Sequence, residues 1–339
     1  MEIESILDRG LRGKGITREE AKRLIVEAKP GTKLFYDLIH DADSLSRRSF
    51  NNRGEVHAQV GVNLAPCPKN CGFCAFAEEA QLFKNRVTST ADEVVKRARD
   101  FESQRANVIY LMSTADYPFD DMLVHARNVR AAISERMPLV ANIGDFNYGQ
   151  AKELLDAGFT AAYHVCRLRE GVDTSIEPLE RLRTIEAAKK AGLDVCYCVE
   201  PIGPEHSADE LVEAIFRGLD LKVQVHATMR RIPVRGTRLF SNGTIREVEQ
   251  AKITAITRLV MGDSILAMGV HEPSMASLLS GSNYVYAEVG PNPRDVREET
   301  SMGRGRDVVA CKQMLWDAGF ETFDEPAISL AGPLRGLAR

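Results

Sequence analysis

Three of the seven cysteines, Cys67, Cys71 and Cys74, lie close together in the 339-residue chain. The segment Asn63-Leu-Ala-Pro-Cys-Pro-Lys-Asn-Cys-Gly-Phe-Cys74 directly follows a predicted strand. Three thiolates in a tight loop can bind three irons of a cubane iron–sulfur cluster, whose fourth iron then lacks a protein ligand. The alternatives are a zinc site or a loop without metal. Structural zinc sites have four ligands, and no fourth Cys or His is nearby in the sequence, so the spacing favours iron and sulfur.

Composition narrows the class of protein. Lys and Arg number 44 against 48 for Asp and Glu, the pI is near 6.0, and 44% of residues are hydrophobic. We therefore expect a globular chain with no nucleic-acid partner. The apolar stretches are shorter than the ~18 residues that a membrane span needs, and acidic residues follow Met1, so we predict no membrane segment and no signal peptide. A cytoplasmic location, where thiols stay reduced, is the expectation.

Short β-rich runs alternate with amphipathic helical patterns along most of the chain. This alternation predicts a parallel sheet, and at this length an α/β fold of the (β/α)8 TIM type. A doubly wound open sheet is the alternative, although no GxGxxG or P-loop motif supports it. We predict a helical extension over residues 1–50, the barrel over 51–325, and a tail over 326–339 that forms a loop or cap at one end of the barrel. The eight predicted strands are Val56–Leu64, Val108–Met112, Leu139–Ile143, Ala161–Cys166, Asp194–Val199, Val223–Met229, Ile265–Ala267 and Tyr284–Val289.

Polar and apolar residues alternate within several of these strands, so one set should face the barrel axis and the other the helices. We predict that the polar sets face the axis and line a ligand site. The alternative is an error of one residue in the register. The predicted inward sets are His57, Gln59 and Asn63; His164 and Cys166; Asp194, Cys196, Cys198 and Glu200; and Gln224, His226 and Thr228.

The pattern Cys-x3-Cys-x-aromatic-Cys after the first strand of a barrel resembles the signature of the radical S-adenosylmethionine (SAM) superfamily. Within it, the chain is similar to the biotin-synthase-related branch, which includes biotin synthase, the [FeFe]-hydrogenase maturase, methylornithine synthase and lipoyl-forming relatives. The resemblance implies a [4Fe-4S] cluster that cleaves SAM to a 5′-deoxyadenosyl radical. Similar segments are Gly15–Ala21, Cys196–Glu205, Ile232–Leu239 and Gly281–Tyr286.

The resemblance also assigns residues to the cofactors. It implies that Cys67, Cys71 and Cys74 are the cluster ligands and that Phe73 lies near adenine. Arg167, Glu170 and Asp173 follow the fourth strand, where relatives hold the ribose and methionine ends of SAM. Glu205 is a further polar contact to SAM, and Glu200 a weaker one.

Biotin synthase carries a second cluster inside its barrel. Cysteines on several strands and an arginine hold that cluster. The resemblance places Tyr110 and Val140 at two of these cysteine positions, so that only Cys196 is retained. Val270-His271 stands in the region where biotin synthase has the arginine. An auxiliary cluster on Cys166, Cys196 and Cys198 is a separate hypothesis, and small buried hydrophobes are the alternative. Cys311 is predicted to pack in the core.

Residues after the seventh and eighth strands should meet on the catalytic face of a barrel. We predict catalytic roles for His271, Tyr286 and Glu288, with His271 exchanging a proton beside the substrate. Helix capping and loop contacts are the alternative. The predicted substrate-binding residues, suited to a small anionic metabolite, are Asp116, His226, Arg230 and Arg294.

The expected function is hydrogen abstraction from a small biosynthetic precursor, in a carbon-skeleton or bond-forming step of cofactor or amino-acid biosynthesis. Sulfur insertion into an unactivated C–H bond, with an auxiliary cluster, is the first alternative. A non-enzymatic iron–sulfur carrier or sensor is the second. The resemblance implies a low-potential electron donor of the flavodoxin or ferredoxin type.

Overall fold

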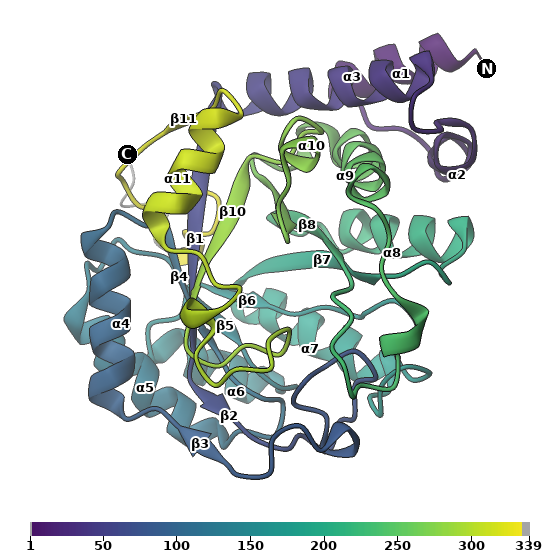
Figure 1. The fold of residues 1–339 in the computed structure, drawn as a ribbon. Coiled ribbons are helices and arrows are strands. Elements are labelled where there is room, and N and C mark those ends of the chain that lie inside the picture. The colour runs from purple at the N-terminus through teal and green to yellow at the C-terminus, as the bar shows by residue number, and fades with distance from the viewer. Residues whose placement is uncertain (1, 334–339) are drawn as a thin grey trace.

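Eight parallel strands form a closed barrel in the computed structural model, which describes residues 2–333 (Figure 1). The last strand pairs back onto the first, with Glu55 opposite Tyr284 and Val60 opposite Val289. This closure confirms the barrel over the open sheet. The barrel strands are β1 (Arg53–Gly61), β4 (Val108–Met112), β5 (Leu139–Asn142), β6 (Ala161–Tyr163), β7 (Asp194–Ile202), β8 (Val225–Arg230), β9 (Met268–His271) and β10 (Tyr284–Val289).

Helices surround the barrel, and several of them begin after a residue whose side chain caps the first turn. Thr90, Asn147 and Ser207 each accept a bond from a backbone N–H of the first turn, and Glu93, Gln150 and Glu210 close the capping boxes. The helices are α4 (Ala91–Ser103), α5 (Phe119–Ala132), α6 (Tyr148–Asp156), α7 (Pro178–Ala191), α8 (Ala208–Asp220), α9 (Glu247–Met261), α10 (Met275–Leu278) and α11 (Val308–Asp317). None of the helices within residues 2–333 has the length and apolarity to cross a bilayer.

Short elements complete the structure. β2 (Asn63–Leu64) pairs with β3 (Val87–Thr88), and β11 (Glu321–Thr322) pairs with the start of β1. The 3-10 turns are η1 (Glu78–Ala80), η2 (Phe240–Asn242), η3 (Gly262–Ser264) and η4 (Thr300–Met302). One predicted strand was misplaced: residues 265–267 precede β9 as a connection in which Ile265 and Ala267 are buried and Leu266 is exposed. The pairing with β8 and β10 begins only at Met268 and Gly269.

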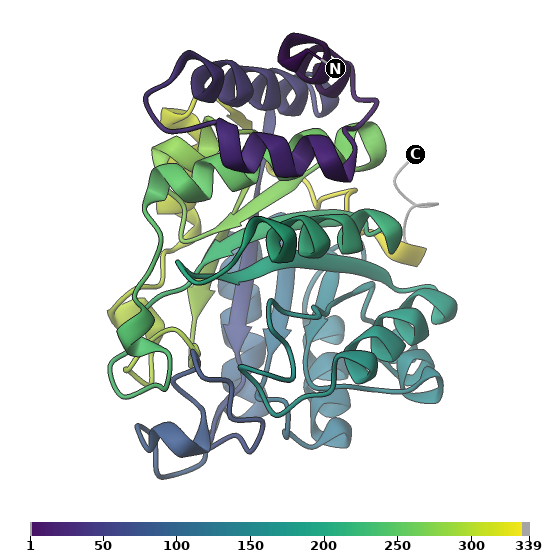
Figure 2. The same ribbon diagram turned by 90° about the vertical axis from the view of Figure 1, so that its right-hand side faces the viewer.

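The predicted N-terminal helices are α1 (Ile3–Leu11), α2 (Arg18–Glu27) and α3 (Lys33–Ser49). The capping box of Thr17 and Glu20 is present at the start of α2. Leu24, Leu38 and Leu45 share an apolar core with α8 and α9. The three helices lie at the end of the molecule opposite the cysteine loop (Figure 2). Because this core is shared, the division at residue 50 stays a prediction.

The C-terminal segment crosses the N-terminal ends of the barrel strands. Ser329 Oγ donates to Glu55 Oε2 at 2.9 Å, and the Gly332 amide donates to Asp194 Oδ2 at 2.7 Å. The Thr160 hydroxyl donates to the Leu330 carbonyl at 2.9 Å. The described part of the tail therefore closes the floor of the barrel, and residues 334–339 of the predicted tail lie outside the described residues.

Aromatic and imidazole rings fill much of the barrel interior, where branched aliphatic side chains are usual. The His57 ring stacks on Tyr284 with centroids 4.1 Å apart, and the His271 ring stacks on Tyr286 at 3.9 Å. Tyr110 Oη lies 2.9 Å from His57 Nδ1 and 3.5 Å from the Cys196 sulfur. The centre of the barrel is thus polar, as predicted, but densely packed.

The predicted inward orientation of the polar side chains is confirmed for β1 and β7 but is wrong for β6 and β8. Tyr163, assigned to the outward set of β6, points into the barrel and donates a hydrogen bond to Glu200. On β8, His226 lies against Gly218 of α8, and the Thr228 hydroxyl lies 2.7 Å from that of Thr254 on α9. Polar side chains face outward on this strand because Gly218 of α8 leaves space for His226 and Thr254 of α9 provides a hydrogen-bond partner for Thr228. The alternation of polar and apolar residues along the strand does not contain this information.

Candidate functional site

The cysteine loop lies at the C-terminal ends of the strands, where barrel enzymes carry their chemistry (Figures 1 and 2). Three other loops hold it through backbone hydrogen bonds. The Gly72 amide donates to the Asp173 carbonyl at 2.8 Å, the Leu239 amide to the Gly72 carbonyl at 2.7 Å, and the Ala75 amide to the Pro293 carbonyl at 2.8 Å. The loop is therefore fixed by segments that follow β6, β8 and β10.

All three cysteines of this loop line one open cavity. Burial raises the pKa of Cys67, that of Cys71 to about 11, and that of Cys74 further still. A bound metal centre reverses this preference, because a coordinating thiol is deprotonated outright. The Phe76 amide lies 3.3 Å from the Cys74 sulfur and donates to it, a contact typical of iron–sulfur ligands.

The spacing of these sulfurs fits a cluster better than a single ion. Among residues 2–333, the groups of ligand atoms that come within 4.8 Å of one another do not include this trio. The ligand atoms of one zinc ion lie closer together than 4.8 Å. The irons of a cubane occupy separate corners, so the thiols that bind them can lie farther apart. The residues present therefore fit the cluster that the sequence motif predicts.

The predicted SAM-binding residues divide into two groups. Phe73 and Arg167 line the cavity beside the cysteines. Glu170 is buried behind it and accepts hydrogen bonds from the Thr174 hydroxyl at 2.6 Å and the Arg167 amide at 2.9 Å. Glu170 therefore shapes the loop after β6 and is not part of the cavity wall.

Asp173 and Glu205 also lie outside the cavity lining. Asp173 pairs with Arg169 at 3.7 Å, and its carbonyl holds the cysteine loop. Glu205 accepts two hydrogen bonds from the guanidinium of Arg231, which is almost fully buried. Glu205 is partly desolvated, but this pairing holds its pKa down to about 2. Both carboxylates have protein partners already.

The cavity wall includes polar residues that were missing from the sequence-based site. Tyr163 was excluded by the wrong register of β6, and Arg181 lies inside α7, where nothing in the sequence marks it. Arg181 Nη1 lies 3.2 Å from Asp145 Oδ2, and Asp145 Oδ1 is 2.8 Å from His164 Nε2. Burial lowers the pKa of His164 to about 4, so its ring is neutral. Further lining residues are Gln59, Asn142, Met229 and Lys69.

Two predicted residues, His271 and Arg294, line the far end of the same cavity. Arg294 Nε donates to Glu272 Oε1 at 2.9 Å, and Nη2 donates to Glu288. Its third nitrogen, Nη1, lies 3.7 Å from the Met229 sulfur, which is a weak acceptor. One edge of this buried guanidinium therefore remains available to an anion.

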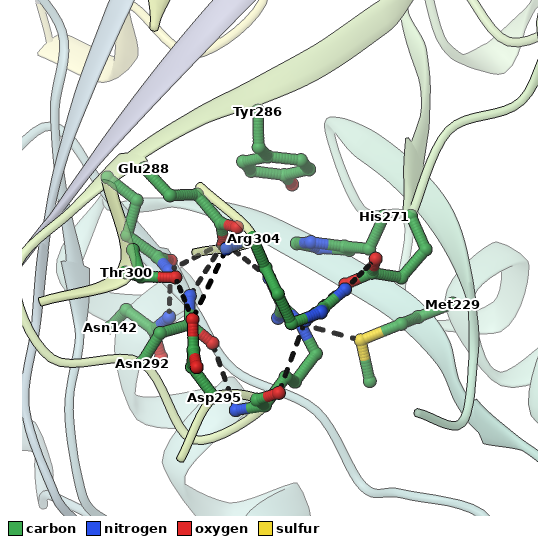
Figure 3. A network of polar contacts seen from close by, with 12 residues as sticks. Asn142, Met229, His271, Tyr286, Glu288, Asn292, Asp295, Thr300 and Arg304 are labelled. Atoms are coloured by element: carbon green, nitrogen blue, oxygen red, sulfur yellow. Dashed lines mark hydrogen bonds and ion pairs between the residues drawn. The ribbon is translucent and has the colours of Figure 1, made fainter. Parts of the chain in front are cut away.

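Tyr286 and Glu288 stand behind these two residues and do not line the cavity. Tyr286 stacks on His271, as Figure 3 shows, and Glu288 accepts from Arg294, Gln59 and Asn292. Burial, together with the charge of Arg294, lowers the pKa of His271 well below its usual range. A neutral imidazole is therefore presented to the cavity.

The loop after β10 forms a polar network at the mouth of the barrel (Figure 3). The Thr300 hydroxyl donates to Asp295 Oδ2 at 3.1 Å, and the Arg304 guanidinium pairs with Glu272. Glu272 thereby bridges Arg294 and Arg304. Several charge-assisted bonds hold the Arg294 side chain in one orientation.

Three predicted substrate-binding residues are not brought into the cavity. Asp116 pairs with Arg86 at 2.8 Å near the mouth. His226 is buried between β8 and α8, and Arg230 pairs with Glu247 at the start of α9 at 3.0 Å. The predicted inward orientation of His226 and Arg230 is wrong, for the reason given for β8.

The three cysteines of the auxiliary-cluster hypothesis have different surroundings. Cys196 contacts Tyr110 in the barrel interior, and Cys198 lies beside Glu200. Cys166 lies on the side of the wall that faces α8, where its carbonyl accepts from Tyr197 at 2.9 Å. Cys311 is buried, and its thiol donates to the Tyr286 carbonyl at 3.3 Å.

A closed (β/α)8 barrel with a cysteine loop and a polar cavity at the C-terminal strand ends defines a barrel enzyme with a metal-cluster site. The family model of the radical SAM superfamily matches residues 66–217 of the chain. Residues 66–217 therefore form a radical SAM domain, and the chain is a radical SAM enzyme with a [4Fe-4S] cluster and SAM as its cofactors. It is similar to the biotin-synthase-related branch of that superfamily.

Relatives and solved structures agree with this assignment. The chain is 25% identical over 330 residues to biotin synthase of Clostridioides difficile (strain 630), covering 94% of this chain and 98% of that protein. It is 28% identical over 283 residues to biotin synthase of Kocuria rhizophila, covering 80% of this chain and 59% of that protein. The fold matches methylornithine synthase (PylB) with a TM-score of 0.79 and 15% identity, over 96% of this chain and 98% of that one. It matches HydG, a maturase of the [FeFe]-hydrogenase, with a TM-score of 0.79 and 16% identity, over 94% of this chain and 75% of that one.

Proposed function

We propose that Cys67, Cys71 and Cys74 hold the [4Fe-4S] cluster and that the enzyme abstracts a hydrogen atom from a small anionic precursor in cofactor or amino-acid biosynthesis. The observation that carries this proposal is the single cavity that joins the three thiols to Arg294 and His271. When bound, SAM and the cluster supply the 5′-deoxyadenosyl radical. Positioning and shielding are the protein's part of such chemistry.

The residues of the cavity have separate tasks in this proposal. Phe73 and Arg167 bind SAM beside the cysteines, while Nη1 of Arg294 binds a carboxylate or phosphate of the substrate. Glu272 and Glu288 orient the guanidinium. The aromatic interior below the cavity excludes water from the barrel axis, which protects a carbon radical from side reactions.

Sulfur insertion is the second candidate, because the curated relatives are named biotin synthase. The packing around Cys196 supports the first candidate instead. Tyr110 Oη stands 3.5 Å from the Cys196 sulfur, and the rings of His57, Tyr284 and Tyr286 fill the adjacent space. A second cluster beside Cys196 would have to displace these rings.

Anaerobic reconstitution followed by iron and sulfide analysis tests the two candidates. We expect about four irons per chain, and the same number in a Cys196→Ser/Cys198→Ser variant. Additional iron that is lost in this double variant would favour sulfur insertion.

Product analysis tests the enzymatic proposal itself. With dithionite and SAM we expect 5′-deoxyadenosine from the wild-type protein and none from Cys71→Ala, with Cys311→Ala as the matched control that retains activity. A cluster-loaded wild-type protein that leaves SAM intact would instead identify an iron–sulfur carrier or sensor.

In the cell we propose a cytoplasmic enzyme that receives electrons from a low-potential donor of the flavodoxin or ferredoxin type.

A further inference from the structure

Three different metal-binding side chains converge at the inner end of the cavity. A sulfur of Cys198, a carboxylate oxygen of Glu200 and a ring nitrogen of His271 all lie within 4.8 Å of one another. Cys198 is 1% exposed, and Glu200 and His271 are each 4% exposed. Cys198 and Glu200 share the inner face of β7, and His271 ends β9. These residues are separate from the cysteine loop.

The imidazole of His271 has a hydrogen-bonding position that the protein leaves unused. Nε2 lies 3.5 Å from Tyr163 Oη, and Nδ1, although buried, has no hydrogen-bond partner among the described residues. A buried polar atom without a partner is destabilising, so such an atom in a native structure calls for a ligand or another explanation. Imidazole is among the commonest metal ligands in proteins and can coordinate through either ring nitrogen.

The neighbours of the three side chains orient them in the way that outer groups orient metal ligands. Tyr163 donates its O–H to Glu200, and Arg167 Nε lies 3.1 Å from the other oxygen of the same carboxylate. The stack on Tyr286 fixes the plane of the His271 ring. The positive charge of Arg294 is already balanced by its two carboxylate partners.

We propose that Cys198, Glu200 and His271 bind one divalent transition-metal ion, with a fourth coordination position open to the cavity. A thiolate, a carboxylate and an imidazole suit Zn²⁺ or Fe²⁺, which share this ligand chemistry. Metal–ligand bonds of about 2.0–2.3 Å place tetrahedral ligand atoms about 3.3–3.8 Å apart, so the present spacing needs to shrink by about 1.5 Å at most. Binding releases the thiol proton of Cys198 to solvent.

Three protein ligands with an open position are the arrangement of metal sites that bind substrate. Glu200 and His271 line the cavity, so the open position faces the space where the substrate lies. A carboxylate, carbonyl or hydroxyl oxygen of the substrate would complete the coordination. The site goes beyond the proposed hydrogen abstraction, and its ligands are independent of the cysteine loop.

Cobalt titration tests the site directly. The full chain carrying Cys67→Ser, Cys71→Ser and Cys74→Ser lacks cluster absorption, and its circular dichroism is first compared with that of the unmodified chain. We expect Co²⁺ to produce a near-ultraviolet thiolate-to-metal band that saturates at one ion per chain. Adding Cys198→Ala should abolish the band, and Glu200→Gln or His271→Ala should weaken Co²⁺ binding at least tenfold. Cys196→Ala, on the same face of the same strand, is the control that keeps the band.

A second measurement uses the cluster-loaded protein and decides the matter if the triple variant does not fold. After incubation with Zn²⁺ and desalting, we expect one zinc per wild-type chain and none per Cys198→Ala chain. Equal zinc in both proteins, or a cobalt band that survives Cys198→Ala, would overturn the proposal. Both measurements report metal binding alone, so they remain distinct from a failure to cleave SAM.

Discussion

Replacing His226 with leucine should make the protein less sensitive to acid. His226 is buried between β8 and α8, its Nδ1 accepts from the Ala227 amide at 2.9 Å, and its Nε2 has no partner among the described residues. Burial lowers the pKa of His226 to about 4. The unfolded chain has a histidine pKa of about 6.5, so it takes up a proton at a pH where the folded protein does not.

The sign and size of the effect follow from this difference. Stability is undiminished above about pH 6.5, and it falls as the pH drops toward 4. The full difference of about 2.5 pKa units corresponds to roughly 3 kcal/mol, and about 2 kcal/mol of it is lost by pH 5. For a chain of this length, 2 kcal/mol corresponds to a change in Tm of about 3 °C.

Thermal unfolding of the cluster-loaded wild-type and His226→Leu proteins at pH 8 and pH 5 measures this difference. We expect Tm to fall by about 3 °C more in the wild type than in the variant, while 5′-deoxyadenosine formation at pH 8 is retained. An equal fall in both proteins would contradict the burial argument. Loss of SAM cleavage at pH 8 in a folded variant would instead restore His226 to the site.

Three further substitutions test particular contacts. Gly218→Ala should destabilise the protein by about 1–3 kcal/mol, because the added carbon would lie 2.3 Å from Nε2 of His226, and the Tm at pH 8 reports it. Glu205→Gln should cost about 3 kcal/mol because it leaves the buried Arg231 without its charged partner, and an unchanged Tm would contradict the ion pair seen here. Tyr110→Phe should lower the free energy of unfolding by about 1–3 kcal/mol, because it leaves a nitrogen of His57 unpaired. The iron content should stay at the wild-type value. Tm measurement checks the first expectation, and iron analysis checks the second.

The general architecture could be predicted because it depends on local signals. Capping residues such as Thr90 and Ser207 mark where helices begin, and β-rich runs between them mark the strands. The cysteine loop was predictable for the same reason, since its three cysteines lie in one short segment. Closure of the barrel was expected from the chain length and from the lack of a GxGxxG or P-loop motif, because the number of strands alone does not separate a barrel from an open sheet.

The walls of the cavity depended on tertiary contacts that no local pattern contains. Tyr163 was assigned to the wrong face because alternation on a strand of three residues leaves the register undetermined. His226 and Thr228 were expected inside because polar residues were assumed to avoid the helix layer, yet Gly218 and Thr254 give them space and a partner there. Arg181 acquires its position only when α7 packs beside the loop after β6.

The loop that carries Cys67, Cys71 and Cys74 has consequences for maturation. Its amides are tied to Asp173 and Pro293, and the second contact joins residues more than two hundred positions apart in sequence. Such distant contacts form late in folding, because they carry a large loop-closure entropy. We therefore expect that iron is inserted only after the last strand of the barrel has been synthesised and docked. In a ribosome-bound chain that lacks β10, the cysteine loop would not yet have its contact with Pro293.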